Sequence, residues 1–147
     1  MFWLSTAMAA SGDYSLRLKG GPSFSLHEWN MQGRFGGEFD YDFGYSLGFN
    51  LQTMFGVSDK FRYDLIPSVR VDYLYLGPAY LYGIFGVGLS VFDRQAAMDL
   101  RFGTGMTLPL GDSFEFNTDV NLYVAPVGLP VTPVTLDWLM GFGFRFH

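Results

Sequence analysis

The feature that most constrains this chain is a regular alternation of apolar and polar residues, which is clearest in its last segment, residues 134–146. Even-numbered positions there are all apolar and include Trp138. Odd-numbered positions are mostly small or charged, as at Asp137 and Arg145. Because side chains alternate between the two faces of a β-strand, the segment predicts a strand with one apolar and one polar face.

The same alternation recurs in seven earlier segments. They cover about residues 13–24, 31–41, 45–52, 60–73, 80–91, 98–108 and 114–124. The residues between them predict tight turns at 42–44, 76–78 and 111–113, and loops near 27–30, 56–59, 92–97 and 125–133. In a chain of 147 residues this predicts one all-β domain, an eight-stranded antiparallel up-and-down β-barrel.

The distribution of charge indicates which kind of barrel to expect. Of the 23 charged residues, 18 lie on the polar side of a predicted strand and none on the apolar side; the remaining five fall in loops or turns. A Lys or Arg that faces lipid at mid-membrane costs about 2–4 kcal/mol. The pattern therefore predicts a transmembrane barrel with an apolar outer wall, whereas a soluble barrel with an apolar lumen would show the reverse.

One uncharged stretch offers an alternative to the barrel. The twenty residues from Tyr73 to Phe92 are long enough for a membrane helix. However, Gly77 and Pro78 lie near the middle of this stretch, and most of its other residues are Tyr, Phe, Val, Ile and Gly. These features favour two strands joined by a turn.

Two further strand features follow from the pattern. Pro67 interrupts the fourth predicted strand and predicts a bulge or a weakened ladder there. Aromatic residues gather at the strand ends nearest the two termini, as an interfacial girdle requires. They are Tyr14, Tyr41, Phe43, Tyr45, Tyr73, Tyr75, Phe114, Phe144 and Phe146.

The first ten residues are treated separately from the barrel, which we assign to residues 11–147. They are apolar, and Ala7-Met8-Ala9 has the form of a signal-peptidase site, but no basic residues precede it. The segment is therefore either the remnant of a signal peptide or an N-terminal arm.

With these strands assigned, the chain resembles the small outer-membrane barrels of the OmpA/OmpX type over about Asp13 to Phe146. The resemblance rests on size, strand number and inverted polarity. It implies an outer-membrane location in a Gram-negative bacterium, with both termini periplasmic. The C-terminus also resembles the signal read by the barrel-assembly machinery, which would consist of Gly141, Phe144 and Phe146. The chain departs from that signal at Leu139, where a polar residue is usual, and in ending on His147.

The lumen of an eight-stranded barrel is just wide enough for side chains to fill it. The inward parity carries eight cations and ten acids, which favours mutual pairing. The predicted ion-pair network consists of Asp13, Arg17, Lys19, Arg34, Glu38, Asp40, Arg62, Asp64, Arg70, Asp72, Arg101, Asp119, Asp137 and Arg145. Inward glycines would make space for long side chains from the facing wall. A solid polar plug is favoured, and a narrow gated pore is the alternative.

Two specific contacts are predicted within this network. Arg17 and Lys19 should meet Glu38 or Asp40 across the first hairpin, because these residues lie on the same face of paired strands. Asp13 should lie near Arg145 where the barrel closes.

Several functional classes are disfavoured. The net charge of −5 argues against nucleic-acid binding, and the absence of cysteine excludes thiol chemistry. The two histidines, His27 and His147, are too far apart for a metal-ligand motif. We expect no catalytic residues, no metal and no cofactor.

The function that remains is that of a structural or accessory membrane barrel. One form of the accessory role is a subunit of a larger outer-membrane complex. The expected partners are outer-membrane lipid or lipopolysaccharide and the assembly machinery. The alternatives are a narrow channel for ions or small solutes and, with less support, a lipid-modifying enzyme.

Overall fold

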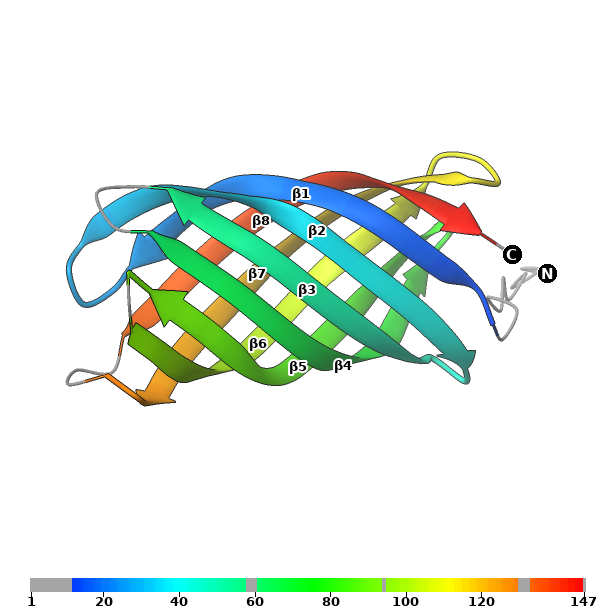
Figure 1. Ribbon diagram of the computed structural model, residues 1–147. Coiled ribbons are helices and arrows are strands. Elements are labelled where there is room, and N and C mark those ends of the chain that lie inside the picture. The colour runs from blue at the N-terminus through cyan, green and yellow to red at the C-terminus, as the bar shows by residue number, and fades with distance from the viewer. Residues whose placement is uncertain (1–11, 58–60, 94, 130–132, 147) are drawn as a thin grey trace.

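The computed structural model describes residues 12–57, 61–93, 95–129 and 133–146, which form a single closed barrel (Figure 1). Its eight strands are β1 (Tyr14–Ser25), β2 (Asn30–Gly44), β3 (Leu47–Val57), β4 (Arg62–Leu76), β5 (Ala79–Phe92), β6 (Gln95–Pro109), β7 (Phe114–Val127) and β8 (Val134–Phe146). The N-terminal segment and Lys60 lie outside the described residues, so the expectations for them are not tested here.

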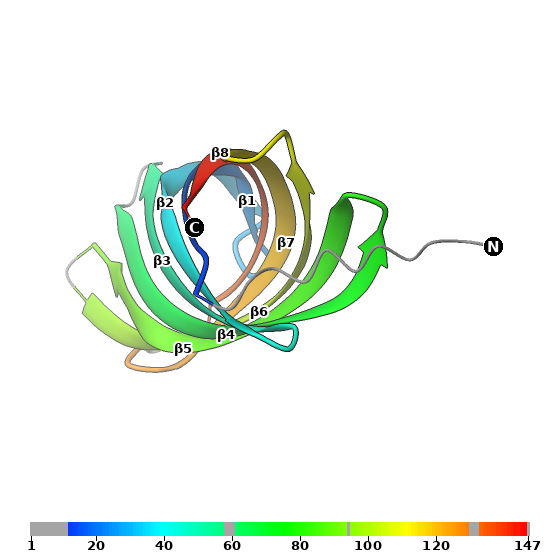
Figure 2. The same ribbon diagram turned by 90° about the vertical axis from the view of Figure 1, so that its right-hand side faces the viewer.

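Each strand pairs antiparallel with its neighbours in the chain, and β1 pairs with β8 to close the cylinder. Tyr14 lies opposite Phe146 in this closing pair, so the first and last strands begin and end at the same end of the barrel. Figure 2 shows the closed ring from that end, which we call the terminal end; the opposite end is the distal end. The predicted fold class is confirmed.

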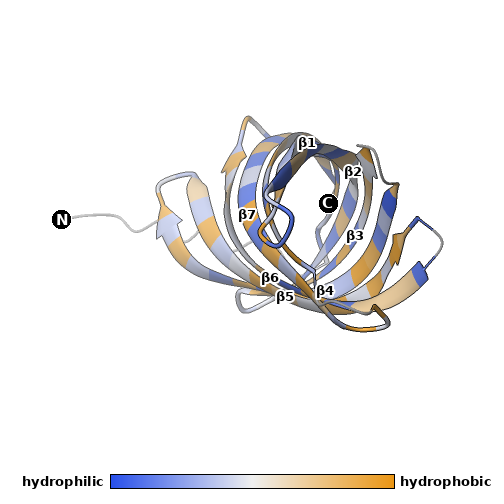
Figure 3. Ribbon diagram, turned by 90° about the vertical axis from the view of Figure 1, so that its left-hand side faces the viewer, coloured by the Kyte–Doolittle hydropathy of each residue, from blue (hydrophilic) through white to orange (hydrophobic). Residues whose placement is uncertain are grey.

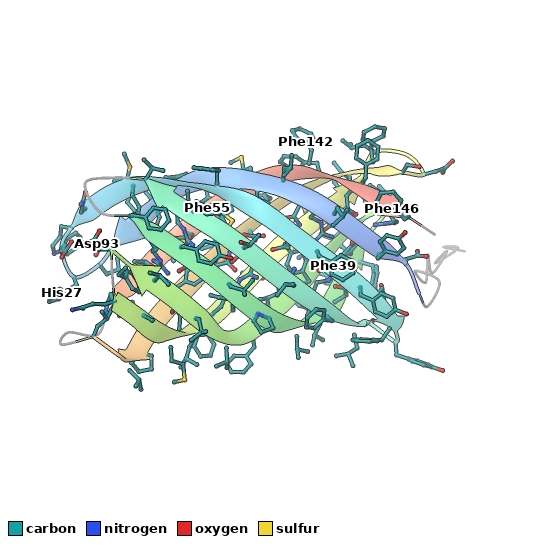
Figure 4. All side chains as sticks on the ribbon, in the orientation of Figure 1. His27, Phe39, Phe55, Asp93, Phe142 and Phe146 are labelled. Atoms are coloured by element: carbon teal, nitrogen blue, oxygen red, sulfur yellow. The ribbon has the colours of Figure 1, made fainter. Side chains whose placement is uncertain are left out.

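The alternation of the sequence explains how the wall is built. Along β8, the residues from Leu136 to Phe144 are alternately exposed and buried. The hydropathy colouring in Figure 3 shows the same banding along several strands. Phe142 extends outward from β8 in Figure 4 and is 63% exposed, whereas Asp137 on the same strand is fully buried. The described charged residues of the strands all lie on the inward side.

The turn between β2 and β3 differs from the prediction. It consists of Tyr45 and Ser46, which have φ values of 56° and 64°, rather than residues 42–44. A register shift between Asp42 and Gly44 adds a residue to β2, and Asp42 Oδ1 accepts a hydrogen bond from the Gly44 amide at 2.7 Å. The bulge moves the two-residue turn along the chain. Two positive φ values are typical of the type I′ hairpin turn.

The other connections lie close to the predicted ones, but several strands are longer than expected. The β4–β5 turn is Gly77-Pro78, and residues 110–113 join β6 to β7. Strand β3 runs on to Val57, β6 already begins at Gln95, and β7 continues to Val127. The distal loops are correspondingly shorter than the sequence pattern indicated, because alternation continues past the first turn-forming residues.

The register shift in β4 is not at Pro67. The β4–β5 register is the same on both sides of Pro67 and changes only between Asp72 and Leu74. This bulge reverses the parity of the strand end, so Tyr75 pairs with the inward-facing Tyr80. The bulge therefore changes the predicted parity of Tyr75, whose side chain is 48% exposed at the end of the strand. A pattern with a period of two residues does not reveal one extra residue.

Three threonines on the outer wall bind the polar atoms of neighbouring aromatic side chains. The pairs are Thr53 Oγ1 with Tyr63 Oη at 3.3 Å, Thr104 Oγ1 with Tyr73 Oη at 2.9 Å and Thr118 Oγ1 with Trp138 Nε1 at 3.1 Å. The polar atoms of these aromatic residues are thus hydrogen-bonded within the wall itself.

Candidate functional site

The candidate site is the lumen, which is occupied by charged and polar side chains. Arg101 and Asp64 are fully buried, and Lys19 is 4% exposed. Burying a charge is costly unless the charge is paired and hydrogen-bonded. The ion pairs fall into two groups, which we name the terminal-side cluster and the distal cluster.

Ten residues form the terminal-side cluster. They are Arg17, Lys19, Arg70, Arg101, Arg145, Glu38, Asp40, Asp72, Glu115 and Asp119. Its centre is Arg17 of β1, whose Nη1 lies 3.1 Å from Glu38 Oε1. Arg17 also pairs with Asp40 of β2 and, across the lumen, with Glu115 of β7. One guanidinium therefore holds carboxylates from two strands that do not touch each other.

Glu38 is the second focus of the terminal-side cluster. Lys19 Nζ lies 2.6 Å from Glu38 Oε1 and also pairs with Asp119 of β7. Arg101 Nη2 of β6 reaches Glu38 Oε2 from the opposite wall at 3.2 Å. A carboxylate with cations on three sides fixes β1, β2 and β6 relative to one another.

The remaining pairs of this cluster lie at the terminal mouth. Arg70 lies 3.1 Å from Asp40 and 2.9 Å from Asp72, while Arg145 lies 3.0 Å from Glu115. The Arg145 side chain keeps 20% of its surface exposed, so this pair borders solvent.

The distal cluster consists of Arg34, Arg62, Asp64, Asp99 and Asp137. Arg62 lies 2.9 Å from both Asp64 and Asp99. Arg34 pairs with Asp64 and, across the lumen, with Asp137. Asp64 is therefore the carboxylate shared by the two arginines. The carboxylates outnumber the cations by one within the described part of this cluster.

Aromatic rings line the guanidinium groups at both levels. The Tyr123 ring lies 4.9 Å from the Arg34 guanidinium carbon and 5.2 Å from that of Arg62. Near the terminal mouth, Arg70 lies 5.3 Å from the Tyr80 ring and 5.2 Å from the Tyr82 ring. Rings at these distances stabilise cations by cation–π attraction.

Neutral polar side chains complete the network, and the sequence prediction of the site omitted them. Arg101 donates to Asn121 Oδ1 at 2.8 Å and to Asn50 Oδ1 at 2.7 Å. Tyr82 donates to Asp119 Oδ2 at 3.1 Å, and Asn117 donates to Tyr82 Oη at 2.8 Å. These neutral residues have inward parity in the sequence, but the predicted network contains charged residues only.

The inward glycines make room for side chains and backbone of adjacent strands, rather than for side chains of the facing wall as the sequence predicts. A Cβ on Gly143 would lie 2.6 Å from Arg17 Cγ on the neighbouring strand. A Cβ on Gly105 would lie 2.5 Å from the Tyr82 hydroxyl and 2.7 Å from Asp119 Cβ, both on neighbouring strands. Long polar side chains lie flat over these glycines, which allows a narrow lumen to hold so many of them.

The structure brings most of the expected residues together. Arg17 and Lys19 both contact Glu38, and Arg17 also contacts Asp40. Asp13 is buried and lines the small cavity at the terminal mouth together with Arg145. The carboxylate that pairs with Arg145 is, however, Glu115. Glu115 and Asp99 belong to the two clusters although they were missing from the predicted network.

The residues proposed as the assembly signal lie at the end of β8. Gly141 faces the lumen beside Lys19, and Phe144 and Phe146 lie on the outer face, 49% and 39% exposed. The Phe144 ring lies 4.2 Å from that of Phe114 on β7. Leu139, the unusual apolar residue of this signal, is fully buried in the lumen.

Other site types have little support. His27 lies in the β1–β2 loop at the distal end (Figure 4), and His147 lies outside the described residues. Among the residues that the structure places, no three His, Asp or Glu side chains are arranged to hold a metal ion. No described helix has the length and apolarity needed to cross a membrane.

Comparisons with known proteins agree on the fold. Neither a protein-family model nor a curated protein sequence matches the chain. Among solved structures, Neisserial surface protein A has a TM-score of 0.77 at 14% identity, over 92% of this chain and 98% of that one. The attachment invasion locus protein Ail of Yersinia pestis has a TM-score of 0.66 at 15% identity, over 92% and 99%. OprG, an outer membrane protein of Pseudomonas aeruginosa, has a TM-score of 0.66 at 17% identity, over 93% and 97%.

These likenesses extend over nearly the whole of each chain, and their low identity limits them to the fold. Strand number, closure and inverted polarity are the properties that the sequence pattern predicted. The chain has the fold of the small eight-stranded outer-membrane barrels of the OmpA/OmpX type.

Proposed function

We propose that this chain is an integral outer-membrane barrel with a plugged lumen, and that it acts as a structural or accessory membrane protein rather than as an enzyme. The observation that carries the proposal is the filled, ion-paired lumen enclosed by an apolar wall. Arg17, Glu38 and Arg101 connect opposite walls at the middle of the barrel, where a pore would need open space.

Lipid is the first partner that this surface favours. Leu18, Leu89 and Phe142 are 78%, 61% and 63% exposed on the outer wall. A contiguous apolar surface of this kind marks a membrane or protein interface. Outer-membrane lipid or lipopolysaccharide would cover it, the barrel-assembly machinery would insert it, and a larger outer-membrane complex would cover part of it in the accessory role.

Ion conductance in planar bilayers tests the plug. The wild-type barrel should give no regular current steps, because paired side chains fill the lumen. A double variant Glu38→Ala, Arg101→Ala, which shortens two side chains that meet across the lumen, should conduct. A matched double variant of exposed loop residues, His27→Ala, Trp29→Ala, should stay closed. Regular steps from the wild-type barrel would instead support a narrow channel.

Location and orientation can be tested with single cysteines, because the chain contains none. We propose that the terminal end is periplasmic. Trp29 at the distal end is 89% exposed, and Tyr45 at the terminal end is 93% exposed. On intact cells an impermeant maleimide should label Trp29→Cys and should label Tyr45→Cys only after the outer membrane is permeabilised. The reverse pattern would overturn the orientation.

The accessory role requires its own test. Copurification in mild detergent should recover a stable outer-membrane partner at fixed stoichiometry. Recovery of the barrel alone, with lipid, would leave a solitary structural barrel as the function. Incubation with lipopolysaccharide should leave the mass of the lipid unchanged, and a defined mass change would contradict the non-enzymatic assignment.

A further inference from the structure

Besides its bulges, the backbone ladder of the wall has two gaps at which the register does not change. In the β1–β8 pair, the ladder passes from Gly20↔Met140 to Ser23↔Asp137 and leaves out Gly21 and Pro22. In the β4–β5 pair it passes from Leu65↔Leu89 to Ser68↔Gly86 and leaves out Ile66 and Pro67. The register is unchanged across each gap, so these are missing rungs and not bulges.

Each gap arises from the missing N–H of a proline. Hydrogen-bonded pairs recur at every second residue of an antiparallel ladder. The Leu26 amide bonds the Val134 carbonyl, which places Pro22 at a hydrogen-bonded position opposite Trp138. The Asp93 amide likewise bonds the Phe61 carbonyl, which places Pro67 at such a position opposite Val87. The carbonyls of Trp138 and Val87 therefore lack their ladder donors.

The two gaps divide the cylinder into equal halves. In the strand order of the closed barrel, the β8–β1 and β4–β5 seams lie opposite each other. One half-shell is β1–β4 and the other is β5–β8. The β6–β7 ladder also leaves out residues, between Met98↔Val127 and Leu100↔Val124, where Pro126 lies, but there the register shifts. Among the residues described, the gaps with unchanged register are those at Pro22 and Pro67.

The distal cluster lies at the height of the gaps and spans both of them. Asp137 is opposite Ser23, next to Pro22. Arg34 of β2 pairs with Asp137 of β8, so this ion pair reaches over β1 and crosses the first seam. Asp99 is opposite Gly88, which lies across the second gap from Ile66.

The second spanning pair completes the arrangement. Arg62 of β4 pairs with Asp99 of β6 at 2.9 Å, so this pair reaches over β5 and crosses the second seam. Arg62 Nη1 also donates to Thr135 Oγ1 of β8 at 2.7 Å. Asp64 binds both arginines within the first half-shell.

We propose that the barrel is built as two half-shells whose backbone gaps are clasped from inside by Arg34–Asp137 and Arg62–Asp99, so that breaking either pair permits local opening of its own seam. Unsatisfied backbone groups are costly inside a bilayer, where water cannot bind them. The ion pair beside each gap links strands on both sides of the seam and offsets the missing backbone hydrogen bond. The charge state of the distal cluster thereby controls where the wall opens. This inference concerns the wall and holds whether or not the lumen conducts.

Native-state amide hydrogen exchange in detergent micelles tests the proposal residue by residue. In the wild-type barrel, the amides of Trp138 and Val87 should exchange about tenfold faster than those of Phe35 and Phe55, a directly opposed pair in the continuous part of the β2–β3 ladder. Equal protection of the four amides would overturn the proposal.

Two variants separate the seams. Asp137→Asn should accelerate exchange of Trp138 by about another tenfold and leave Val87 unchanged, and Asp99→Asn should do the reverse. The control is Asp72→Asn, whose partner Arg70 is on the same strand and spans no seam. It should change neither amide. Equal acceleration of every seam by both variants would contradict separate clasps.

A second pair of variants does not depend on weakening the protein. Pro22→Val and Pro67→Val each restore an N–H at a gap and should slow exchange at that gap by about tenfold, with no change at the other. Unchanged exchange in both variants would show that the prolines do not determine seam opening.

Discussion

The two ion clusters of the lumen are both buried, but they differ in how completely their carboxylates are bonded. In the terminal-side cluster, the two oxygens of Asp119 bond Lys19, Tyr82 and Asn121. In the distal cluster, Asp137 Oδ1 has no hydrogen-bond partner among the described residues. Neutralising Asp137 should therefore remove fewer interactions than neutralising Asp119.

The largest effect should come from replacing Arg17, the centre of the terminal-side cluster. Arg17→Met keeps the aliphatic volume but leaves Glu38, Asp40 and Glu115 with one cation fewer. Breaking a buried pair by removing one partner costs about 3–5 kcal/mol. Denaturant unfolding in micelles should show a loss of this size. A loss below about 1 kcal/mol would mean that the cluster is far more hydrated than its burial indicates.

The sharpest comparison neutralises one carboxylate in each cluster. Asp119→Asn removes a carboxylate that pairs with Lys19 and bonds Tyr82 and Asn121, and it should cost about 3 kcal/mol of unfolding free energy. Asp137→Asn changes a carboxylate whose Oδ1 has no partner among the described residues, so it should cost only about 1.4 kcal/mol, the amount that corresponds to tenfold more frequent opening of its seam. Equal losses in the two variants would remove the distinction between the clusters.

Packing around the terminal-side cluster gives the third effect. A Cβ on Gly143 would lie 2.6 Å from Arg17 Cγ and 2.9 Å from the Leu16 carbonyl oxygen, whereas a Cβ on Gly33 would meet nothing within 4 Å. Gly143→Ala should therefore cost about 1–3 kcal/mol by overpacking. Gly33→Ala, the matched control, should be close to neutral in the same unfolding measurement.

The smallest effect should come from the solvent-exposed edge of the same cluster. Arg145 is partly exposed, and its pair with Glu115 is screened by water. Arg145→Gln should cost less than about 1 kcal/mol, and high salt should reduce the difference from wild type. A cost near that of Arg17→Met would mean that the mouth is as dry as the centre of the lumen.

Alternation in the sequence was sufficient to predict the faces of the strands. It identified Arg70, Arg101 and Asp119 as inward-facing because a period of two residues assigns the side of every residue once the apolar side is known. Ile84 of β5 is likewise buried, with 6% of its surface exposed. Residues that face lipid must be apolar, whereas residues that face this lumen are mostly polar, so the alternation of apolar and polar residues is strong in every strand.

Other features of the site could not be predicted in this way. The bulges near Phe43 and Tyr73 each add one residue to a strand and leave little trace in hydropathy. The cross-lumen pairs, such as Arg17 with Glu115, depend on how far the sheet is sheared when β1 meets β8. Shear is a property of the closed cylinder, and no single strand encodes it.

The hydrogen bonds between threonines and rings on the outer wall affect how the barrel sits in a bilayer. Trp and Tyr usually anchor a membrane protein at headgroup depth, because their polar atoms require water or lipid oxygens. Trp138, Tyr63 and Tyr73 obtain that oxygen from Thr118, Thr53 and Thr104 instead. These three rings can therefore reside within the acyl region at a lower polar cost, so the depth of the barrel in a bilayer should depend on the other Tyr and Trp residues at its ends.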